Sequence, residues 1–450
     1  MKRIITRVSA ILMTLCLVIV GVACQPVATD IPEKTDEPKQ SVDKTAAPDE
    51  QKAESVKVGC VLPLSGSMAT LGQECRNGFD LAISEINDAG GIKNLGGAKI
   101  EVIYADSEND ATVGMTEAER LITDEGVSLI AGAYSSSVTL AICDVSERYK
   151  IPMLVLLASS NSITESGYNY VYRINVGLGY VWSYFEEYLK LCRDAGNELN
   201  NIGIVYESSE LNVANAEVWR GIAKNLGLNI VIDEMYDAKT VTDMSSIVNK
   251  IKNNDVDILW SGSYLSDMLL LAQTMLSYDV SLDMWIGGGG GEQSTEFIAT
   301  LGEASEHVLS PKPVTIDLRT SRPGFNTLCE NYFGLYGGEE EAGNICPLGA
   351  SMSYSNGYVL ADVLERTAGL DCEALCAAFD ATDIKDTEND RALWGMPYFE
   401  INFDENGQCW SFSCVTQIVD GSWRYCWPKE LVVMTAESDG YPIMGWNKKD

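Results

Sequence analysis

The 450-residue chain has a single histidine, His307, and only 32 Lys and Arg residues against 65 Asp and Glu. A Ser-His-Asp or Cys-His arrangement would need that one histidine as its base, which argues against nucleophilic hydrolysis. The formal net charge of −33 leaves no basic footprint for a polyanion, so no nucleic-acid partner is expected. The excess of acid is otherwise typical of a well-solvated surface.

Other signatures of catalysis and metal binding are also missing. There is no G-x-S-x-G elbow and no G-x-x-x-x-G-K-[ST] loop, and the glycine run at 287–291 is followed by Glu292 instead of lysine. Cys372 and Cys376 lie one helical turn apart, but a lone histidine offers little to complete a zinc site. The glutamates at 339–341 suit a solvated loop better than a cation site. We therefore expect no enzyme, no cofactor and no metal, and a secreted hydrolase is the rival interpretation.

The N-terminus carries a targeting signal. Lysine and arginine residues precede an apolar stretch at 11–22, which is too short for an ordinary membrane span and is typical of secretion. The stretch ends just before Cys24, and a cysteine after a small residue at this place resembles a bacterial lipoprotein signal, in which the thiol is lipidated. We expect residues 1–24 to form this signal, with simple secretion as the alternative. Residues 25–55 are rich in Pro, Ala, Thr and charged residues, and should form a disordered tether to the cell membrane.

Cysteine usage leaves the disulfide pattern open. Apart from Cys16 and Cys24 the chain has eleven cysteines, and an odd number cannot all pair within one molecule. Several lie in apolar strand or helix patterns, where cysteine acts as a small hydrophobic residue. The last three, Cys409, Cys414 and Cys426, lie in strand-rich sequence and suggest one bridge.

After the tether, the chain alternates apolar strand patterns with helix patterns. Runs such as VKVGCVLPL (56–64) and VSLIAG (127–132) are each followed by a helical pattern. This alternation predicts parallel sheets with helices on both faces. The rhythm restarts after Asn175 without a linker, which indicates two α/β lobes joined by short crossovers. Turns at 403–407 and 419–423 are typical of strand pairs.

Polar residues gather where strands of the first lobe end. In open α/β sheets, ligands bind beyond the carboxyl ends of the strands. Ser135, Ser136 and Ser137 follow one strand at a helix N-terminus, where hydroxyls either cap the helix or, with the backbone amides, hold a carboxylate. One serine suffices as a cap, so the extra hydroxyls suggest a ligand. Ser159 and Ser160 follow the next strand in the same way.

The second lobe offers similar strand ends. Tyr206 and Glu207 follow one strand, and Tyr264 follows another. A tyrosine at a strand end suits the apolar side of a small ligand, and packing within the protein is the alternative. The glycines at 287–291 either let the backbone approach another group closely or form a mobile loop.

With these residues in view, the chain resembles the leucine/isoleucine/valine-binding protein family, the type I periplasmic solute-binding proteins of ABC transporters. The most specific block is LIAGAYSSSVTLAICDVSERYKIPMLVLLASS (129–160). Residues 58–94 and 396–408 also match the family's pattern. The resemblance implies an α/β protein with the type I periplasmic-binding-protein fold, in which two Rossmann-like lobes joined by three crossovers close on a ligand like a hinged clamp.

By this resemblance the crossovers fall near Asn175, Pro313 and Phe403. Lobe 1 is then expected to combine two segments, and so is lobe 2. The expected segments are 56–175 and 314–402 for lobe 1, and 176–313 and 403–450 for lobe 2.

The resemblance also implies ligand contacts. Ser136 and Ser159 match hydroxyls that hold a ligand carboxylate, and Leu157 matches a residue that contributes its backbone. Tyr264 matches an aromatic residue of the second lobe. The acidic residue that pairs with a ligand ammonium in this family falls at Gly289, so that Glu292 or Glu207 is the expected replacement. The candidate ligand-binding residues are Ser136, Ser137, Leu157, Ser159, Tyr206, Glu207, Tyr264, Gly289 and Glu292.

These expectations combine into one functional hypothesis. The protein should be a monomeric, extracytoplasmic receptor, anchored to the membrane by a lipidated Cys24, that binds a small ligand and delivers it to an ABC permease. The expected ligand is an amino acid or a related carboxylate or amide. A sensory protein that feeds a membrane receptor is the alternative.

Overall fold

The computed structural model describes residues 55–340, 342–385, 389–397, 400–410, 413–428 and 445–448. The predicted signal at 1–24 and the predicted tether at 25–55, apart from Ser55, lie outside these residues. Each helix that the structure describes is either too short or too polar to span a bilayer.

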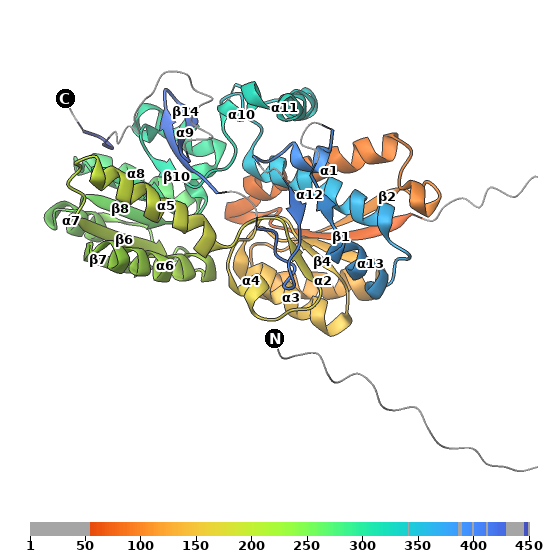
Figure 1. The fold of residues 1–450 in the computed structure, drawn as a ribbon. Helices are drawn as coiled ribbons and strands as arrows, with labels where there is room; N and C mark the ends of the chain where they lie inside the picture. The colour runs from red at the N-terminus through yellow and green to blue at the C-terminus, as the bar shows by residue number, and fades with distance from the viewer. Residues whose placement is uncertain are drawn as a thin grey trace, which may run out of the picture. The chain divides into compact units, whose positions relative to one another are not determined.

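A first sheet consists of five parallel strands in the order β2-β1-β3-β4-β5 (Figure 1). Its strands are β1 (Val56–Leu62), β2 (Ile100–Asp106), β3 (Leu129–Gly132), β4 (Met153–Val155) and β5 (Val171–Arg173). The helices between successive strands are α1 (Ala69–Asp88), α2 (Ala111–Thr123), α3 (Ser136–Tyr149) and α4 (Ser162–Glu165). β3 and β4 are buried along their whole length, as expected of a parallel sheet covered by helices.

A second sheet has seven strands in the order β14-β13-β10-β9-β8-β6-β7. Its strands are β6 (Asn201–Glu207), β7 (Asn229–Tyr236), β8 (Ile258–Gly262), β9 (Met284–Gly287), β10 (Leu309–Ser310), β13 (Val415–Val419) and β14 (Ser422–Trp427). The helices that accompany them are α5 (Leu178–Asp194), α6 (Glu210–Leu226), α7 (Ser245–Asn253), α8 (Leu265–Ser277) and α9 (Thr295–Leu301). β6 to β10 pair in parallel, whereas β13 pairs antiparallel with both β10 and β14. The two predicted parallel α/β units are confirmed.

The remaining α-helices and strands follow β10 in the chain. The helices are α10 (Ile316–Ser321), α11 (Pro323–Tyr336), α12 (Leu348–Arg366) and α13 (Cys372–Asp380), and the strands are β11 (Asp383–Ile384) and β12 (Ile401–Asn402). Short 3₁₀ turns occur at η1 (Gly66–Met68), η2 (Lys93–Leu95), η3 (Gly291–Gln293), η4 (Gly302–Ser305) and η5 (Arg391–Leu393).

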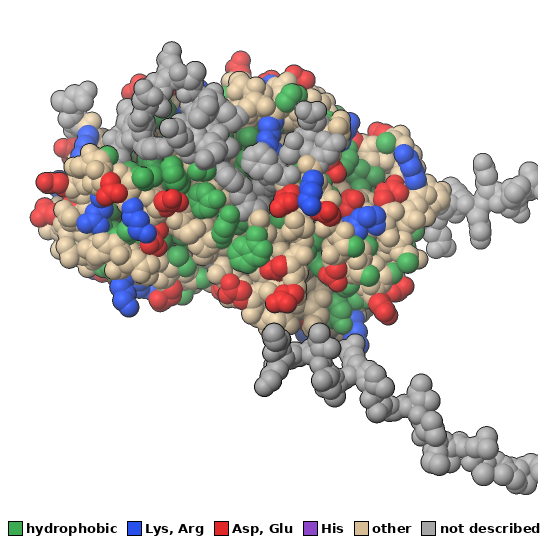
Figure 2. All heavy atoms as spheres, in the orientation of Figure 1, with side chains coloured by type: hydrophobic (Ala, Val, Ile, Leu, Met, Phe, Trp, Pro, Cys, Tyr) green, Lys and Arg blue, Asp and Glu red, His purple; other side chains and the backbone are tan. Residues whose placement is uncertain are grey.

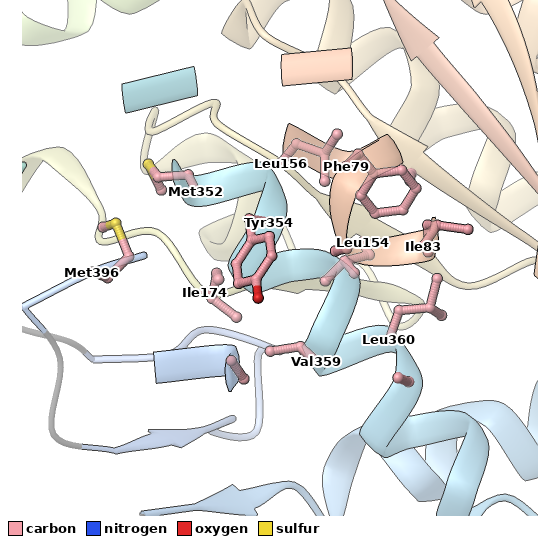
Figure 3. Close-up of a cluster of buried hydrophobic side chains, with 14 of the residues drawn as sticks. Phe79, Ile83, Leu154, Leu156, Ile174, Met352, Tyr354, Val359, Leu360 and Met396 are labelled. Atoms are coloured by element: carbon pink, nitrogen blue, oxygen red, sulfur yellow. The ribbon is translucent and has the colours of Figure 1, made fainter. Parts of the chain in front are cut away.

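Helix α12 is the centre of the core beside the first sheet. Val359 and Leu360 of α12 belong to the same buried cluster as Phe79 of α1 and Leu154 of β4 (Figure 3). Because these side chains are fully buried, truncating Leu360 to alanine should cost about 2–5 kcal/mol. The two helices approach so closely at Gly78 that an added Cβ there would come within 2.0 Å of the carbonyl oxygen of residue 350.

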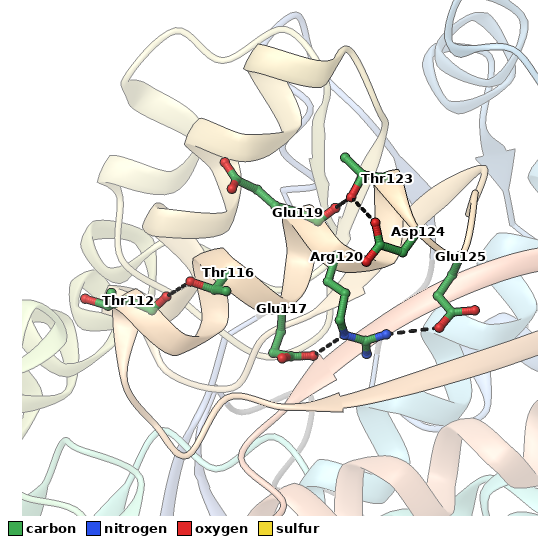
Figure 4. A network of polar contacts seen from close by, with 8 residues as sticks. All are labelled: Thr112, Thr116, Glu117, Glu119, Arg120, Thr123, Asp124 and Glu125. Carbon is green, nitrogen blue, oxygen red and sulfur yellow. Dashed lines mark hydrogen bonds and ion pairs between the residues drawn. The ribbon is translucent and has the colours of Figure 1, made fainter.

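The surface of the protein carries many charged side chains, as the composition predicts. On α2, Arg120 pairs with Glu117 at 2.9 Å and with Glu125 at 3.0 Å, and Thr116 bonds back to the Thr112 carbonyl (Figure 4). Acidic and basic side chains are interspersed on the face shown in Figure 2. Such exposed pairs contribute little to stability, so this surface mainly keeps the protein solvated.

Of the two predicted hairpin turns, the one at 419–423 is confirmed, whereas the turn at 403–407 joins no strand pair, because β12 before it pairs with β11 and Gln408 after it pairs in parallel with Arg173 of β5. Asp420 and Gly421 have φ values of 51° and 70° and form the two-residue connection between β13 and β14, as the I′ type of hairpin turn requires. Gly407 donates its N–H to the Asp404 carbonyl at 3.0 Å. The backbone N–H of Arg173 in β5 donates to the Gly407 carbonyl at 2.8 Å. The end of the 403–407 turn therefore lies beside the first sheet.

The suggested bridge among the last three cysteines is not formed. Cys414 and Cys426 are buried free thiols, which leaves no pair among the three. Burial raises the pKa of both thiols, so they behave as small apolar side chains. Cys372 and Cys376 lie 3.7 Å apart, Sγ to Sγ, and are also free. Within the described ranges, no three His, Cys, Asp or Glu side chains gather as they would around a metal ion.

Candidate functional site

The serine cluster follows β3 at the start of α3. Ser135 is the N-cap residue of α3, yet its side chain makes no capping bond. Its Oγ is buried and has no partner among the residues that the structure describes. The Ser136 Oγ accepts the N–H of Ser160 at 3.3 Å, which ties this loop to the end of β4. Ser137 is half-buried.

A buried arginine holds the loop after β4. Arg173 is 0% exposed and donates to the Ser160 carbonyl at 2.7 Å and to Gln408 Oε1 at 2.6 Å. Burial lowers the pKa of its guanidinium to about 10, so it remains charged at neutral pH. The backbone of Leu157 is engaged as well, because its carbonyl accepts from Asn175 Nδ2 at 2.6 Å. The loop is therefore fixed by hydrogen bonds before any ligand arrives.

An uncharged cavity of about 110 Å³, here called the inner cavity, opens beyond these strand ends. Leu157 and Ser159 line it from the first sheet, and Tyr264 and Gly289 line it from the second. Trp182 and Met352 are among its apolar walls. None of the described residues that line it carries a charge, so it suits the apolar part of a small molecule.

A second cavity of about 1020 Å³, here called the acidic cavity, is bordered by the same Tyr264. Ser135 and Ser137 line it from the first sheet. Its acidic side chains are Glu108, Asp110, Glu207, Glu210, Asp237 and Asp267, and Lys239 is the basic residue in the described lining. Because Tyr264 borders both, the two cavities are neighbours.

The glycine run follows β9 and is packed against both side chains and backbone of neighbouring segments. A Cβ added at Gly288 would lie 2.3 Å from Trp260 Nε1, and one at Gly289 would lie 2.4 Å from the backbone nitrogen of Ser263. At these two positions glycine allows a close approach that a Cβ would prevent. A carboxylate side chain has no room at position 289 in this backbone.

Glu292 is not among the described lining residues of either cavity, although Gly290 and Gln293 close to it in the chain line the inner cavity. Its side chain is 0% exposed, and its Oε1 accepts from Ser310 Oγ at 2.8 Å. Burial raises the pKa of this carboxyl. Glu292 is not among the described residues that line either cavity, so the structure does not bring it together with the serines.

The two residues at the end of β6 differ in role. The Tyr206 hydroxyl accepts from Arg220 Nη2 at 2.8 Å, and the side chain borders neither cavity. The Glu207 carboxylate borders the acidic cavity, but it accepts the Ser209 N–H at 2.8 Å and Asn212 Nδ2 at 2.6 Å. Both of its oxygens are thus occupied by the start of α6.

Sequence reasoning missed two acidic residues of the site. Glu210 is the first residue of α6 and Asp267 lies in the first turn of α8. The Ser160 hydroxyl donates to Glu210 Oε1 at 2.5 Å, and the Tyr236 hydroxyl donates to Asp267 Oδ2 at 2.5 Å. Both follow parallel strands, so the strand-end rule would have found them if it had been extended by one helical turn.

Comparisons with known proteins agree with this geometry. A model of the periplasmic binding protein family matches residues 55–421. The Leu/Ile/Val-binding protein homolog 7 of Brucella melitensis is 30% identical over 364 residues, covering 78% of this chain and 86% of the relative. The leucine-binding protein LivK of Thermotoga maritima has a TM-score of 0.69 at 20% identity, covering 82% of this chain and 97% of that chain. An ABC transporter solute-binding protein of R. palustris, solved with 4-hydroxybenzoate, has a TM-score of 0.67 at 18% identity, covering 82% and 95%.

The family match covers the first sheet, all strands of the second sheet except β14, and the loops that line the two cavities. The structural neighbours share the fold over nearly their whole length. This is the type I periplasmic-binding-protein fold of two Rossmann-like lobes joined by three crossovers. The chain thus belongs to the periplasmic binding protein family and is a solute-binding protein of the ABC-transporter type.

Proposed function

We propose that this protein is the lipid-anchored receptor of an ABC importer and binds a small amino-acid-like, carboxylate or amide ligand by closure of its lobes. The observation that carries the proposal is the pair of cavities that meet at Tyr264, lined by strand ends of both sheets. Buried polar atoms without partners at this place, among them Ser135 Oγ and Tyr264 Oη, need a ligand or water to satisfy them.

The start of α3 supports a carboxylate contact. The N-terminus of this helix carries a partial positive charge, and Ser135 Oγ beside it is buried without a partner in the described part of the chain. Ser159 and the backbone of Leu157 border the neighbouring inner cavity. Relatives bind carboxylates, since LivK of Thermotoga maritima is a leucine-binding protein and the R. palustris protein was solved with 4-hydroxybenzoate.

The two cavities differ in size and in character. The acidic cavity of about 1020 Å³ alone reaches the volume of a ligand pocket, commonly about 300–1,000 Å³, and the inner cavity of about 110 Å³ is an apolar recess beside it. An apolar group would enter the inner cavity beside Trp182 and Leu211, with the polar groups of the ligand in the acidic cavity. A ligand that contacts both lobes makes more contacts in the closed conformation than in the open one. Its binding therefore shifts the equilibrium toward the closed conformation.

Anchoring and partners complete the proposal. The processed protein is held to the outer face of the cell membrane by a lipid on Cys24, through the tether at 25–55, and acts as a monomer without enzymatic activity or cofactor. The lobes comprise 56–175 with 314–402 and 176–313 with 403–450. The closed form docks on an ABC permease. A sensory role is the second candidate. A gene for an ABC permease next to the gene for this protein would favour transport over sensing.

The experiment is a ligand screen by thermal unfolding of the processed protein. Amino acids, short carboxylates and amides are each added in large excess. A ligand at ~100 times its dissociation constant stabilises the folded state by ~2.7 kcal/mol, which raises the melting temperature by several degrees. At least one class should do so, and a screen without any shift would refute the proposed ligand classes.

A further inference from the structure

A third cavity, of about 260 Å³, lies outside the site already described and is here called the lysine cavity. It shares Gln293 with the inner cavity and no described residue with the acidic cavity. Tyr264, which borders both of those cavities, is not among its described lining residues. The proposed ligand site at Tyr264 therefore does not account for the lysine cavity.

The walls of the lysine cavity come from three parts of the chain. They are the loop before α9 with α9 itself, the start of β14, and the segment before α12. The side chains of Ile298, Ile345 and Trp423 make much of the wall apolar. The volume is just below that of common ligand pockets, about 300–1,000 Å³, so the cavity suits a small molecule with an apolar part.

Lys312 places an ammonium group in this wall. The residue is only 3% exposed, and its Nζ donates to the Gln293 carbonyl at 2.7 Å and lies 6.0 Å from the centre of the Trp423 ring. Gln293 and Trp423 both line the cavity, so the ammonium lies between two residues of its wall. An ammonium carries three N–H donors, of which the bond to Gln293 uses one.

The charge of Lys312 has no partner in direct contact. Among the described residues it forms no ion pair. Burial lowers the pKa of this ammonium to about 8, although the carboxylates of Glu74 and Glu292 act in the opposite direction. Glu340, the acidic residue in the described wall, is exposed and so surrounded by solvent. A buried charge without a contacting counter-ion is costly, and an anion bound beside it would offset part of that cost.

We propose that the lysine cavity is a second ligand site, which binds a small organic acid with its carboxylate on the Lys312 ammonium and its apolar part against Ile345 and Trp423. A carboxylate supplies the acceptors and the opposite charge that the ammonium lacks. The hydroxyl of Ser422 is a further polar group of the same wall. An uncharged ligand of the same shape would leave the charge unpaired. The site is separate from the one at Tyr264 and goes beyond the proposed function.

The test is a calorimetric titration of the processed protein with two acids, benzoate and isovalerate, and with their uncharged amides. It is run at pH 6 in a buffer without other carboxylates. At this pH the Lys312 ammonium is charged, and Glu74, whose pKa burial raises to about 7, is mostly neutral. At least one acid should bind, and its amide should bind at least ~10-fold more weakly.

Two variants locate the acid in the lysine cavity. Lys312→Met keeps the unbranched side chain but removes the charge, and should weaken the tighter-binding acid ~10–100-fold. Ala299→Trp fills the cavity from α9 and should weaken the same acid while the ammonium is kept. Ala299 is exposed, so this second variant does not disturb the core and the test does not depend on the folding of Lys312→Met alone.

Lys250→Met is the matched control. Lys250 pairs with Glu234 at 2.6 Å, has a side chain that is 47% exposed, and is not among the described residues that line the lysine cavity. It loses the same charge as Lys312→Met but should bind the acid with the affinity of the unchanged protein.

The outcomes separate this inference from the proposed function. An acid that also enters the site at Tyr264 should show two binding events, of which Lys312→Met removes one and Tyr264→Ala the other. Acid binding that is lost only in Tyr264→Ala, and is unchanged in both Lys312→Met and Ala299→Trp, would overturn the inference and support the proposed function. Failure of both acids to bind, or equally tight binding of their amides, would also overturn the inference, and the ligand screen would still test the proposed function.

Discussion

The Ser160 hydroxyl donates a 2.5 Å hydrogen bond to Glu210 Oε1 and so joins the end of β4 to the first residue of α6. Ser160 also donates its N–H to Ser136 Oγ at 3.3 Å, and its carbonyl accepts from the guanidinium of Arg173 at 2.7 Å. One residue thus connects the serine cluster, the buried arginine and the acidic cavity. This connection explains how a loop of the first sheet positions a carboxylate of the second.

Ser160→Ala tests that connection. Without the hydroxyl, Glu210 loses the bond that orients it, so ligand affinity should fall ~10-fold and the free energy of unfolding by about 1–2 kcal/mol. Calorimetric titration and urea denaturation measure the two effects. Thr123→Ala on the exposed side of α2 should change neither. Wild-type affinity in Ser160→Ala would show that the bond does not support binding.

Arg173→Lys tests the support of the β4 loop. A lysine cannot reproduce the forked contacts of the guanidinium with Ser160, Ala158 and Gln408, and buried carbonyls would lose their donors. We expect the free energy of unfolding to fall by about 3 kcal/mol. Denaturant unfolding measures the loss. A midpoint equal to that of the unchanged protein would contradict this account of the loop.

The stability should depend on pH through Glu74 of α1. Burial raises the pKa of this carboxyl to about 7, although the Lys312 ammonium and the Thr295 hydroxyl act in the opposite direction. A folded-state pKa above the unfolded value of 4.5 means that the neutral form stabilises the fold. This contribution is fully present below about pH 4.5 and is lost as the pH rises through 7.

Glu74→Gln isolates this effect, because the amide resembles the neutral carboxyl at every pH. The free energy of unfolding of the variant minus that of the unchanged protein should increase by about 3 kcal/mol between pH 4.5 and pH 8. Urea denaturation across that range gives both curves. Parallel curves would mean that Glu74 titrates normally in the folded protein.

Lipidation of Cys24 is a separate prediction, since residues 1–24 lie outside the described structure. Cells grown with a labelled fatty acid should incorporate the label into the unchanged protein and not into Cys24→Ala. The variant should also be lost from the membrane fraction, because the proposed lipid anchor on residue 24 can no longer form. Cys16→Ala is the control and should remain labelled. Equal labelling of Cys24→Ala would place the lipid elsewhere or show that there is none.

The architecture could be predicted because its signals are local. Apolar runs such as 56–64 and 127–132 stop at turn residues and are followed by helical periodicity, which determines parallel α/β units. The turn at Asp420 and Gly421 has the composition that its positive φ values require. Each of these features depends on neighbouring residues only.

The site could be predicted only in part, because its carboxylates depend on tertiary contacts. In a chain with 65 acidic residues, the sequence does not distinguish Glu210 or Asp267 from a solvated side chain. Glu292, expected from the family resemblance as one of two possible partners of a ligand ammonium, accepts a hydrogen bond from Ser310 of β10 through Oε1 and is not among the described lining residues of either cavity. The packing of Gly289 against Ser263 likewise depends on two distant loops and has no local signal.

The central claim is that a small ligand binds at the strand ends that meet at Tyr264. The most direct measurement is a calorimetric titration of the best ligand from the screen against Tyr264→Ala, with Tyr278→Ala at the other end of α8 as the control. The account predicts a loss of affinity of at least ~10-fold in Tyr264→Ala and none in the control. Wild-type affinity in Tyr264→Ala would place the ligand elsewhere and contradict the account.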